Sequence, residues 1–237
     1  MKVAVLGATG FTGEKLVELL LNHPAVKVSY LSAMLDKDTK FSQIFPKFKN
    51  RLDLICKNLD LEEAVSNCDL VFLALPHRVS FEVAPFLLEK GKIVIDLSAD
   101  YRLKDLGVYK EFYGVSHKDP QNVSAAVYGL PEFYRDKIKK AKLIANPGCY
   151  PTVSILSIAP LLKEKLISNV IIDAKSGITG AGRKASLDYH YAHLSGNLFG
   201  YKLFGHQHLP EINQILSEVA GEGISVRFSP HVIPAER

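Results

Sequence analysis

The chain has 237 residues, of which 47% are hydrophobic and 23% charged, and its formal net charge is +4. This length and composition are typical of a globular protein with one large domain or two modest ones. The lysines are scattered and form no basic stripe interleaved with aromatic residues. We therefore expect no nucleic-acid partner. An acidic small molecule is not excluded as a ligand.

The three cysteines, Cys56, Cys68 and Cys149, include no CxxC pair. An odd set without paired spacing indicates neither a disulfide framework nor a thiolate metal site. The apolar run at residues 3–6 is too short for a signal peptide, and no stretch approaches the length that crosses a bilayer. We therefore expect a cytoplasmic protein without a membrane partner.

Residues 2–21 have the pattern of a nucleotide-binding unit. A buried type of strand at 2–6 is followed by three glycines, and apolar residues then recur with helical spacing from 14 to 21. Glycines between a strand and a helix permit a tight turn and a close approach to a pyrophosphate. The spacing is GxxGxxG rather than GxGxxG, so a sharp turn alone is the alternative. We predict a dinucleotide site that comprises Gly7, Thr9, Gly10, Phe11, Thr12 and Gly13.

The end of the second expected strand, at residues 26–31, bears on the choice of dinucleotide. NAD enzymes commonly carry an acidic residue there, which bonds the ribose 2′-OH. This chain has Ser32 and Met34 instead, with Lys37 and Lys40 nearby. Ser32 with either lysine suits a 2′-phosphate, so we predict NADP. Solvated loop residues are the alternative for each lysine.

Strands and helices continue to alternate along the chain. Strands are expected at 70–75, 93–98 and 142–145, and helices at 81–88 and 153–162. This alternation predicts a parallel sheet with right-handed crossovers, whose ligands bind at the carboxyl ends of the strands. We therefore expect Pro76-His77, the segment 98–102 and the segment 146–149 to face one crevice.

Cys149 lies between an expected strand and an expected helix, in the segment Asn-Pro-Gly-Cys-Tyr-Pro-Thr. Backbone N–H groups and the positive end of the helix dipole favour a thiolate at such a place, and a thiolate is a nucleophile. The alternative is a buried cysteine that acts as a small hydrophobe. The convergence of the strand ends favours the nucleophile.

The second half of the chain contains two further motifs. A strand at 170–175 precedes the glycine-rich segment 176–183, which suits an anion or is a flexible loop. Residues 189–193 are interpreted as surface or interface. The motif His206-Gln-His208-Leu-Pro-Glu211 precedes a helix at 213–219, and it lacks a third ligand with zinc spacing, so no metal is expected. A histidine with a pKa near neutrality can act as general acid or base, and Glu211 can orient it or bond a substrate.

Taken together, the motifs resemble those of the N-acetyl-γ-glutamyl-phosphate reductases of arginine biosynthesis over essentially the whole chain. They are the glycine turn at 7–13, Ala-Leu-Pro-His at 74–77, Asp-Leu-Ser-Ala-Asp-Tyr-Arg at 96–102, Tyr-Gly-Leu-Pro-Glu at 128–132, and the segments 146–152, 175–183, 206–212 and 229–231. The aspartate-semialdehyde dehydrogenases share the fold, but their histidine motif is absent here.

The resemblance implies an α/β protein with a Rossmann-type NADP-binding domain at 1–148 and an α+β catalytic and dimerisation domain at 149–237. It implies NADPH-dependent reduction of an acyl phosphate through a thioester on Cys149, with His206 as acid or base. It also implies that Pro76, Ser32, Ser176 and Gly177 contact the cofactor, and that the substrate contacts are Arg102, Asn146, Ser176, His208 and Glu211.

Two departures from the family pattern stand out. Met34 occupies a place where members commonly carry a basic residue, and the chain ends at Arg237, where members continue. The expected second domain is therefore incomplete, and the full-length protein is expected to be a homodimer or homotetramer. Two alternatives remain: a reductase of N-acetyl-aminoadipyl phosphate in lysine biosynthesis, or a truncated nucleotide-binding protein without turnover.

Overall fold

The computed structural model describes residues 1–236, which divide into two compact units. Unit 1 comprises residues 1–104 and 117–146, and unit 2 comprises residues 105–116 and the chain from Pro147 onward. The sequence placed a single boundary after residue 148. The structure differs in assigning the short segment 105–116, which lies far from the boundary in sequence, to the second unit.

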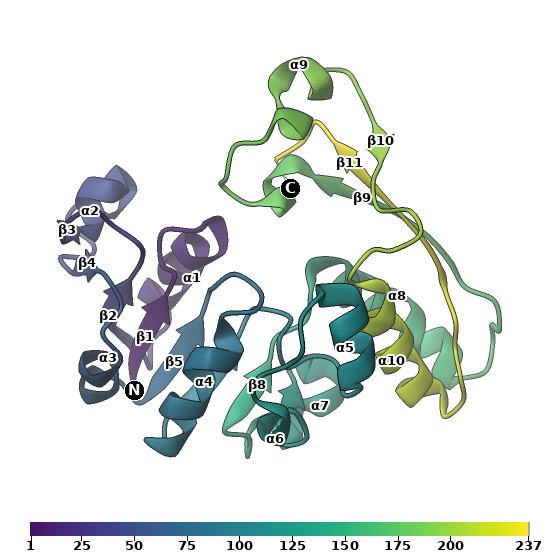
Figure 1. Ribbon diagram of the computed structural model, residues 1–237, viewed down its shortest axis with the longest axis horizontal. Coiled ribbons are helices and arrows are strands. Elements are labelled where there is room, and N and C mark those ends of the chain that lie inside the picture. The colour runs from purple at the N-terminus through teal and green to yellow at the C-terminus, as the bar shows by residue number, and fades with distance from the viewer. Residues whose placement is uncertain (237) are drawn as a thin grey trace. The chain divides into compact units, whose positions relative to one another are not determined.

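Unit 1 is built on an eight-stranded sheet in the order β3-β4-β2-β1-β5-β6-β8-β7 (Figure 1). All neighbouring strands are parallel except β3 and β4, which confirms the predicted α/β architecture. The strands are β1 (Lys2–Leu6), β2 (Lys27–Ser32), β3 (Thr39–Lys40), β4 (Ile55–Lys57), β5 (Leu70–Leu73), β6 (Ile93–Asp96), β7 (Val127–Tyr128) and β8 (Leu143–Ala145).

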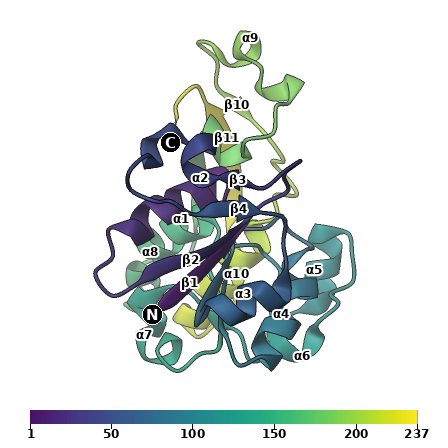
Figure 2. The same ribbon diagram turned by 90° about the vertical axis from the view of Figure 1, so that its left-hand side faces the viewer.

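The helices of unit 1 cover both faces of this sheet. They are α1 (Phe11–Leu21), α2 (Phe41–Ile44), α3 (Leu61–Asn67), α4 (Ser80–Glu89), α6 (Pro120–Val123) and α7 (Pro131–Ile138). Helices α1 and α3 both pack on β1 and β2, from opposite sides of the sheet (Figure 2). Right-handed crossovers produce this arrangement, because the chain runs outward from β1 to β2 and returns from β4 to β5. The order of the strands therefore reverses between β1 and β5, where ligands of such sheets bind.

Strand β1 is central and its residues from Val3 to Leu6 are all buried. A strand that is covered on both faces has no solvent side, which explains its continuous apolar sequence. Strand β5 behaves similarly, with Val71 and Leu73 both fully buried. The core of unit 1 thus holds the ends of these two strands rigidly beside each other.

Unit 2 contains a three-stranded sheet in the order β10-β11-β9. Its strands are β9 (Ile171–Gly177), β10 (Phe199–Gly200) and β11 (Arg227–Ile233), and its helices are α5 (Leu106–Tyr113), α8 (Cys149–Lys163), α9 (Tyr191–Leu194) and α10 (Leu209–Ala220). Helices α8 and α10 pack side by side (Figure 1). On α10 the buried residues Ile212, Ile215 and Leu216 follow the i, i+3, i+4 spacing of an amphipathic helix.

Most predicted elements are confirmed, but some ends differ. Helix α8 begins at Cys149 rather than at 153, since Pro151 lies in the first turn, where a helix does not need its missing N–H. Strand β6 ends at Asp96 rather than at 98, because the Asp96 carboxylate accepts the Ser98 N–H (2.9 Å) and turns the chain. Strand β9 extends through Ser176 and Gly177, which were expected in a loop.

Candidate active site

The predicted glycine turn connects β1 to α1. Gly7 has φ +87°, and a Cβ on it would overlap the Ala74 carbonyl oxygen beyond the end of β5. A Cβ on Gly13 would overlap the Gly7 carbonyl oxygen, so both positions require glycine. A Cβ on Gly10 would make only an ordinary contact at 3.6 Å, so this glycine leaves the start of α1 uncovered. The turn therefore fits a group, such as a pyrophosphate, that approaches backbone N–H groups closely.

Ser32 holds this turn through its backbone. Its carbonyl oxygen accepts the N–H groups of Gly7 (2.8 Å) and Ala8 (2.9 Å), while the residue is only 2% exposed. Met34 is 97% exposed, and the Lys40 ammonium is 2.9 Å from the Asp53 carboxylate. The NADP prediction relied on Ser32 with Lys37 or Lys40, and the structure buries Ser32, pairs Lys40 with Asp53 and exposes Met34 to solvent.

The loops that follow β5 and β6 are joined by hydrogen bonds. The Ala99 N–H donates to His77 Nδ1 (3.0 Å), and the Arg78 N–H donates to Asp100 Oδ1 (2.9 Å). His77 and its neighbour Pro76 are exposed, whereas Asp100 is fully buried. The predicted convergence of these strand ends is confirmed within unit 1.

Arg102 extends this connection to the end of β8. Its Nε donates to the Asn146 carbonyl (2.7 Å) and its Nη2 to the Leu97 carbonyl (2.8 Å), and the residue is 4% exposed. The Asn146 N–H also donates to the Asp96 carbonyl (2.8 Å). The structure thus places the predicted substrate-binding guanidinium on the backbone of the segment that leads to Cys149.

Asp96 is a buried titratable group that sequence reasoning missed. Its Oδ2 accepts the Ser98 hydroxyl (2.8 Å), and burial raises the pKa of its carboxyl to about 6. An acidic residue that ends an apolar strand and is followed two residues later by serine was the available signal. The carboxyl lies under the loop that carries Asp100 and Arg102.

Cys149 is the first residue of α8 and is exposed, whereas Cys56 and Cys68 are buried. Burial raises the pKa of the Cys56 thiol to about 11 and also raises that of Cys68. The N-cap of α8 is Gly148, with no side-chain cap. Of the three thiols, Cys149 alone combines exposure with a helix N-terminus, which excludes the buried-cysteine alternative.

His206 lies in an aromatic pocket of unit 2 and is 7% exposed. The centroids of the Tyr150, Tyr201 and Phe228 rings lie 5.4–5.5 Å from that of its imidazole, each nearly edge-on. Burial, with a smaller contribution from Lys202, lowers the pKa of His206 to about 4. This pKa lies below the near-neutral range that suits a general acid or base, so the imidazole is neutral at pH 7 and a weaker base than an ordinary histidine.

A chain of hydrogen bonds fixes the tautomer of His206. Its Nδ1 accepts the His208 N–H (3.0 Å), so the neutral ring carries its proton on Nε2, which is 3.3 Å from the Tyr201 hydroxyl. That hydroxyl donates to the Tyr150 hydroxyl (3.3 Å), which donates to the His231 carbonyl (3.1 Å). Burial raises the pKa of both tyrosines, so both hydroxyls keep their protons. Tyr150 follows Cys149 directly, and thereby connects the thiol helix to the histidine.

The sequence did not indicate either tyrosine. An aromatic residue beside the cysteine was a signal for Tyr150, but nothing local marked Tyr201. His208 also lies in this cluster, with its ring centroid 4.9 Å from that of His206. Glu211 is 1% exposed, and its Oε1 accepts the Gly148 N–H (2.9 Å).

The segment 176–183 is anchored rather than loose. It continues from β9 as a 3-10 helix, and the Ile178 N–H donates to the Ala235 carbonyl (2.9 Å). The Thr179 hydroxyl donates to the Glu236 carbonyl. Ser176 is partly exposed, and its hydroxyl lies where a Cβ on Gly180 would meet it at 2.9 Å. The absence of a side chain on Gly180 therefore leaves room for the Ser176 hydroxyl.

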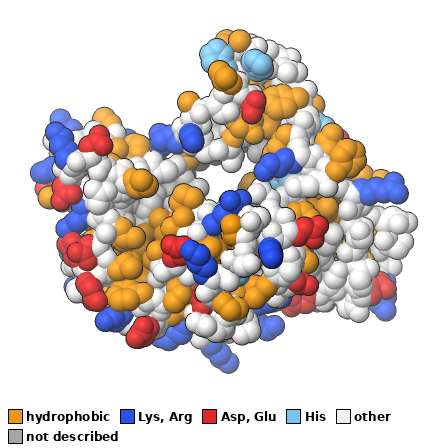
Figure 3. All heavy atoms as spheres, in the orientation of Figure 1, with side chains coloured by type: hydrophobic (Ala, Val, Ile, Leu, Met, Phe, Trp, Pro, Cys, Tyr) orange, Lys and Arg blue, Asp and Glu red, His pale blue; other side chains and the backbone are white. Residues whose placement is uncertain are grey.

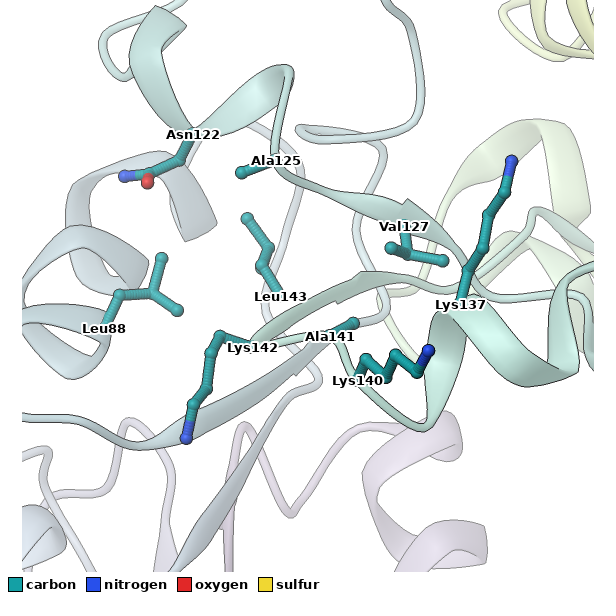
Figure 4. A pocket seen from close by; sticks show the side chains of 9 residues that line it. All are labelled: Leu88, Asn122, Ala125, Val127, Lys137, Lys140, Ala141, Lys142 and Leu143. Carbon is teal, nitrogen blue, oxygen red and sulfur yellow. The ribbon is translucent and has the colours of Figure 1, made fainter.

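Two other surface features lie outside the aromatic cluster around His206. The surface over α9 carries the exposed His190, Tyr191 and His193, and Figure 3 shows histidine and apolar side chains gathered there. An open hollow of about 540 Å³ lies in unit 1 (Figure 4), and it is lined by Leu88, Asn122, Ala125, Val127, Lys137, Lys140, Ala141, Lys142 and Leu143. It lies at the amino ends of β7 and β8, opposite the glycine turn, and its lysine ammonium groups do not converge (Figure 4).

Residues 1–236 contain no group of three or more His, Cys, Asp or Glu side chains arranged to hold a metal ion. Within the same residues, no helix is long and apolar enough to cross a membrane.

Comparison with known proteins gives the family. Residues 2–141 match the semialdehyde dehydrogenase NAD binding domain, and residues 149–237 match the semialdehyde dehydrogenase dimerisation domain. The chain is 44% identical to the N-acetyl-gamma-glutamyl-phosphate reductase of Gloeobacter violaceus and 45% identical to that of Synechocystis, in each case over 100% of this chain and 68% of the relative. The reductase of Aquifex aeolicus is 44% identical, over 100% of this chain and 69% of the relative.

Solved structures show the same fold at low sequence identity. Aspartate semialdehyde dehydrogenase II of Vibrio cholerae has a TM-score of 0.69 at 17% identity, over 99% of this chain and 71% of the other. The aspartate semialdehyde dehydrogenase of Candida albicans, solved with NADP, has a TM-score of 0.69 at 18% identity, over 100% of this chain and 68% of the other. By its sequence identity and its two matched domains, the chain belongs to the N-acetyl-γ-glutamyl-phosphate reductases, an oxidoreductase family with a nicotinamide-dinucleotide-binding domain.

Proposed function

We propose that the protein reduces N-acetyl-γ-glutamyl phosphate to N-acetylglutamate semialdehyde and phosphate, through a thioester on Cys149. The observation that carries this proposal is an exposed thiol at a helix N-terminus, in the same unit as a buried neutral imidazole. The names of the relatives support the choice of substrate.

The proposed reaction begins with transfer of the Cys149 thiol proton to Nδ1 of the neutral His206, the ring nitrogen that carries no proton and that accepts the His208 N–H in the resting protein. The thiolate then attacks the acyl carbon, and phosphate leaves with the electron pair of the broken C–O bond. Bound NADPH would supply a hydride to the thioester carbon. Collapse of the resulting thiohemiacetal expels the thiolate, which recovers a proton from His206, and releases the aldehyde.

The remaining residues are proposed to bind and orient. Gly7, Gly10 and Gly13 form the turn that would receive the pyrophosphate of NADP, and the N–H groups of the first turn of α8 would stabilise the oxyanion. Ser176 and His208 are proposed substrate contacts. The unit from Pro147 onward contains the dimerisation match, so we also propose a homo-oligomer.

The reverse reaction tests this proposal. N-acetylglutamate semialdehyde, phosphate and NADP⁺ are mixed with the protein, and the absorbance of NADPH is followed. Phosphate-dependent formation of NADPH that disappears in Cys149→Ser supports the proposal. The semialdehyde that is one carbon longer tests substrate length, and NAD⁺ tests the cofactor. Absence of turnover with all of these pairs, both in this chain and in the chain extended to the length of its relatives, would remove the reductase function.

A further inference from the structure

Glu211 has an unusual position for an acidic residue. It belongs to the first turn of α10, is 1% exposed, and its Oε1 accepts the Gly148 N–H at 2.9 Å. Gly148 is the N-cap of α8 and immediately precedes Cys149. A buried carboxylate from one helix is therefore bonded to the first backbone donor of another.

This bond replaces a local capping interaction. In a capping box, a Glu or Gln at the third helical position reaches back to the N–H of the N-cap. The third position of α8 is Pro151, which has no side-chain acceptor, so the helix cannot close the box itself. Glu211, 63 residues away in sequence, supplies the missing acceptor.

The same helix carries the histidine turn. His208 is the N-cap of α10, and its N–H holds His206 Nδ1. The bond between Glu211 and Gly148 thus connects the N-terminus that bears the thiol with the N-terminus that bears the imidazole. A shift of either helix start would change the geometry of the pair.

The carboxylate also has an electrostatic consequence. The N-terminus of a helix favours negative charge, and a carboxylate bonded there opposes a second anion close by. Glu211 therefore reduces the preference of this helix end for a thiolate. Cys149 would then rely on the neutral His206 to remove its proton.

We propose that Glu211 is a positioning residue for Cys149: its hydrogen bond fixes the start of α8 against α10, and its charge limits thiolate formation in the resting protein. This inference rests on the proposed role of Cys149 as nucleophile. It assigns to Glu211 a structural and electrostatic task in place of substrate contact.

Three substitutions separate the hydrogen bond from the charge. Glu211→Gln retains an oxygen acceptor without the charge, Glu211→Asp retains the charge on a side chain too short to reach, and Glu211→Ala removes both. Glu218→Gln on the exposed side of α10 is the matched control. The readout is the rate of Cys149 alkylation by iodoacetamide between pH 5 and 10, measured by mass spectrometry, with the buried Cys56 and Cys68 as protected internal references.

We expect Glu211→Gln to shift the alkylation midpoint about one pH unit lower, which raises the rate at pH 7 up to about tenfold. Glu211→Asp should keep the midpoint and lower kcat about tenfold, with KM for the cofactor unchanged. Glu218→Gln should change neither. An unchanged midpoint in Glu211→Gln, or an unchanged kcat in Glu211→Asp, overturns the corresponding half of the inference. Because alkylation needs no turnover, a shifted midpoint in a protein without reductase activity would preserve this inference while the proposed function fails.

Discussion

The chain contains two strand-to-helix turns with almost the same backbone and different uses. Gly10, the N-cap of α1, has φ −68° and ψ 163°, and Gly148, the N-cap of α8, has φ −66° and ψ 162°. Neither N-cap has a side-chain cap. A glycine N-cap therefore opens both helices, and the difference lies in what surrounds it.

The surroundings of the first turn are backbone, and those of the second are functional side chains. Around Gly10, Gly7 and Gly13 pack so closely that no Cβ fits, and the three helical residues that follow all have N–H groups. After Gly148 come Cys149, a tyrosine and a proline, and a carboxylate from α10 bonds the N-cap. The first turn is suited to bind a foreign anion, whereas the second holds an internal one beside a thiol.

The largest expected effect removes the thiol from the second turn. Cys149→Ser should lower reductase turnover by at least about 10³-fold, because a serine hydroxyl is a much weaker nucleophile than a thiolate. Thermal unfolding should be unchanged, since the side chain is exposed. Cys68→Ala, at a buried thiol, is the control that should keep turnover. Comparable activity in the serine variant would show that the second turn carries no nucleophile.

The next effect separates the glycines of the first turn. Gly7→Ala should destabilise the protein by about 3 kcal/mol, because the position has φ +87° and the added Cβ meets a backbone oxygen. Gly10→Ala should leave the melting temperature unchanged and raise KM for the nicotinamide cofactor about tenfold, because its Cβ would stand where a phosphate approaches. Calorimetry and steady-state kinetics of both variants test this. Equal loss of stability in the two variants would contradict the assignment of separate roles.

Each unit also buries one titratable group with a shifted pKa, and the two shifts have opposite effects on how stability depends on pH. The pKa of His206 is lowered to about 4, so its contribution to stability is complete above about pH 6.5 and is lost as the pH falls towards 4. The pKa of Asp96 is raised to about 6, so its contribution is complete below pH 3.8 and is lost as the pH rises through 6. Each amounts to about 3 kcal/mol, and the two oppose each other between pH 4 and 6.

Urea unfolding between pH 4 and 7 can resolve this cancellation. In the His206→Gln variant only the contribution of Asp96 remains, so the free energy of unfolding of this variant should fall as the pH rises. Asp96→Asn should leave the contribution of His206, so that its unfolding free energy increases with pH more steeply than that of the unmodified protein. Parallel pH profiles for all three proteins would contradict both assignments.

The sequence predicted those features that depend on short spacing. The strand, the glycine turn and the start of α1 are adjacent in the chain, and so are the features that place Cys149 at a helix start. It did not predict contacts between distant segments. The bond from Glu211 to Gly148 spans 63 residues. The low pKa of His206 arises from burial by rings of other elements, and local sequence carries no record of that burial.

The assignment of residues 105–116 to unit 2 also depends on contacts between distant segments, so the sequence did not predict it. Helix α5 was not predicted, and its membership depends on contacts such as that of the Tyr113 hydroxyl with the Gln207 carbonyl (3.5 Å), across 94 residues. The pattern of α5 alone shows a short amphipathic helix, and such a helix fits either unit.

The second helical residue is an exposed threonine in α1 and the buried Tyr150 in α8. The smallest expected effect concerns the hydroxyls of Tyr150 and Tyr201, which connect this residue of α8 to His206. Tyr201→Phe removes the hydroxyl that faces His206 Nε2, and should lower kcat about three- to tenfold with KM unchanged, as expected for one lost hydrogen bond of about 1 kcal/mol. Tyr150→Phe should have a similar effect, because it breaks the same chain one bond further on. Since both hydroxyls act through His206, the double variant should lose little more than either single one. Tyr191→Phe, at an exposed tyrosine, should leave kcat unchanged, and losses that multiply in the double variant would show that the two hydroxyls act independently.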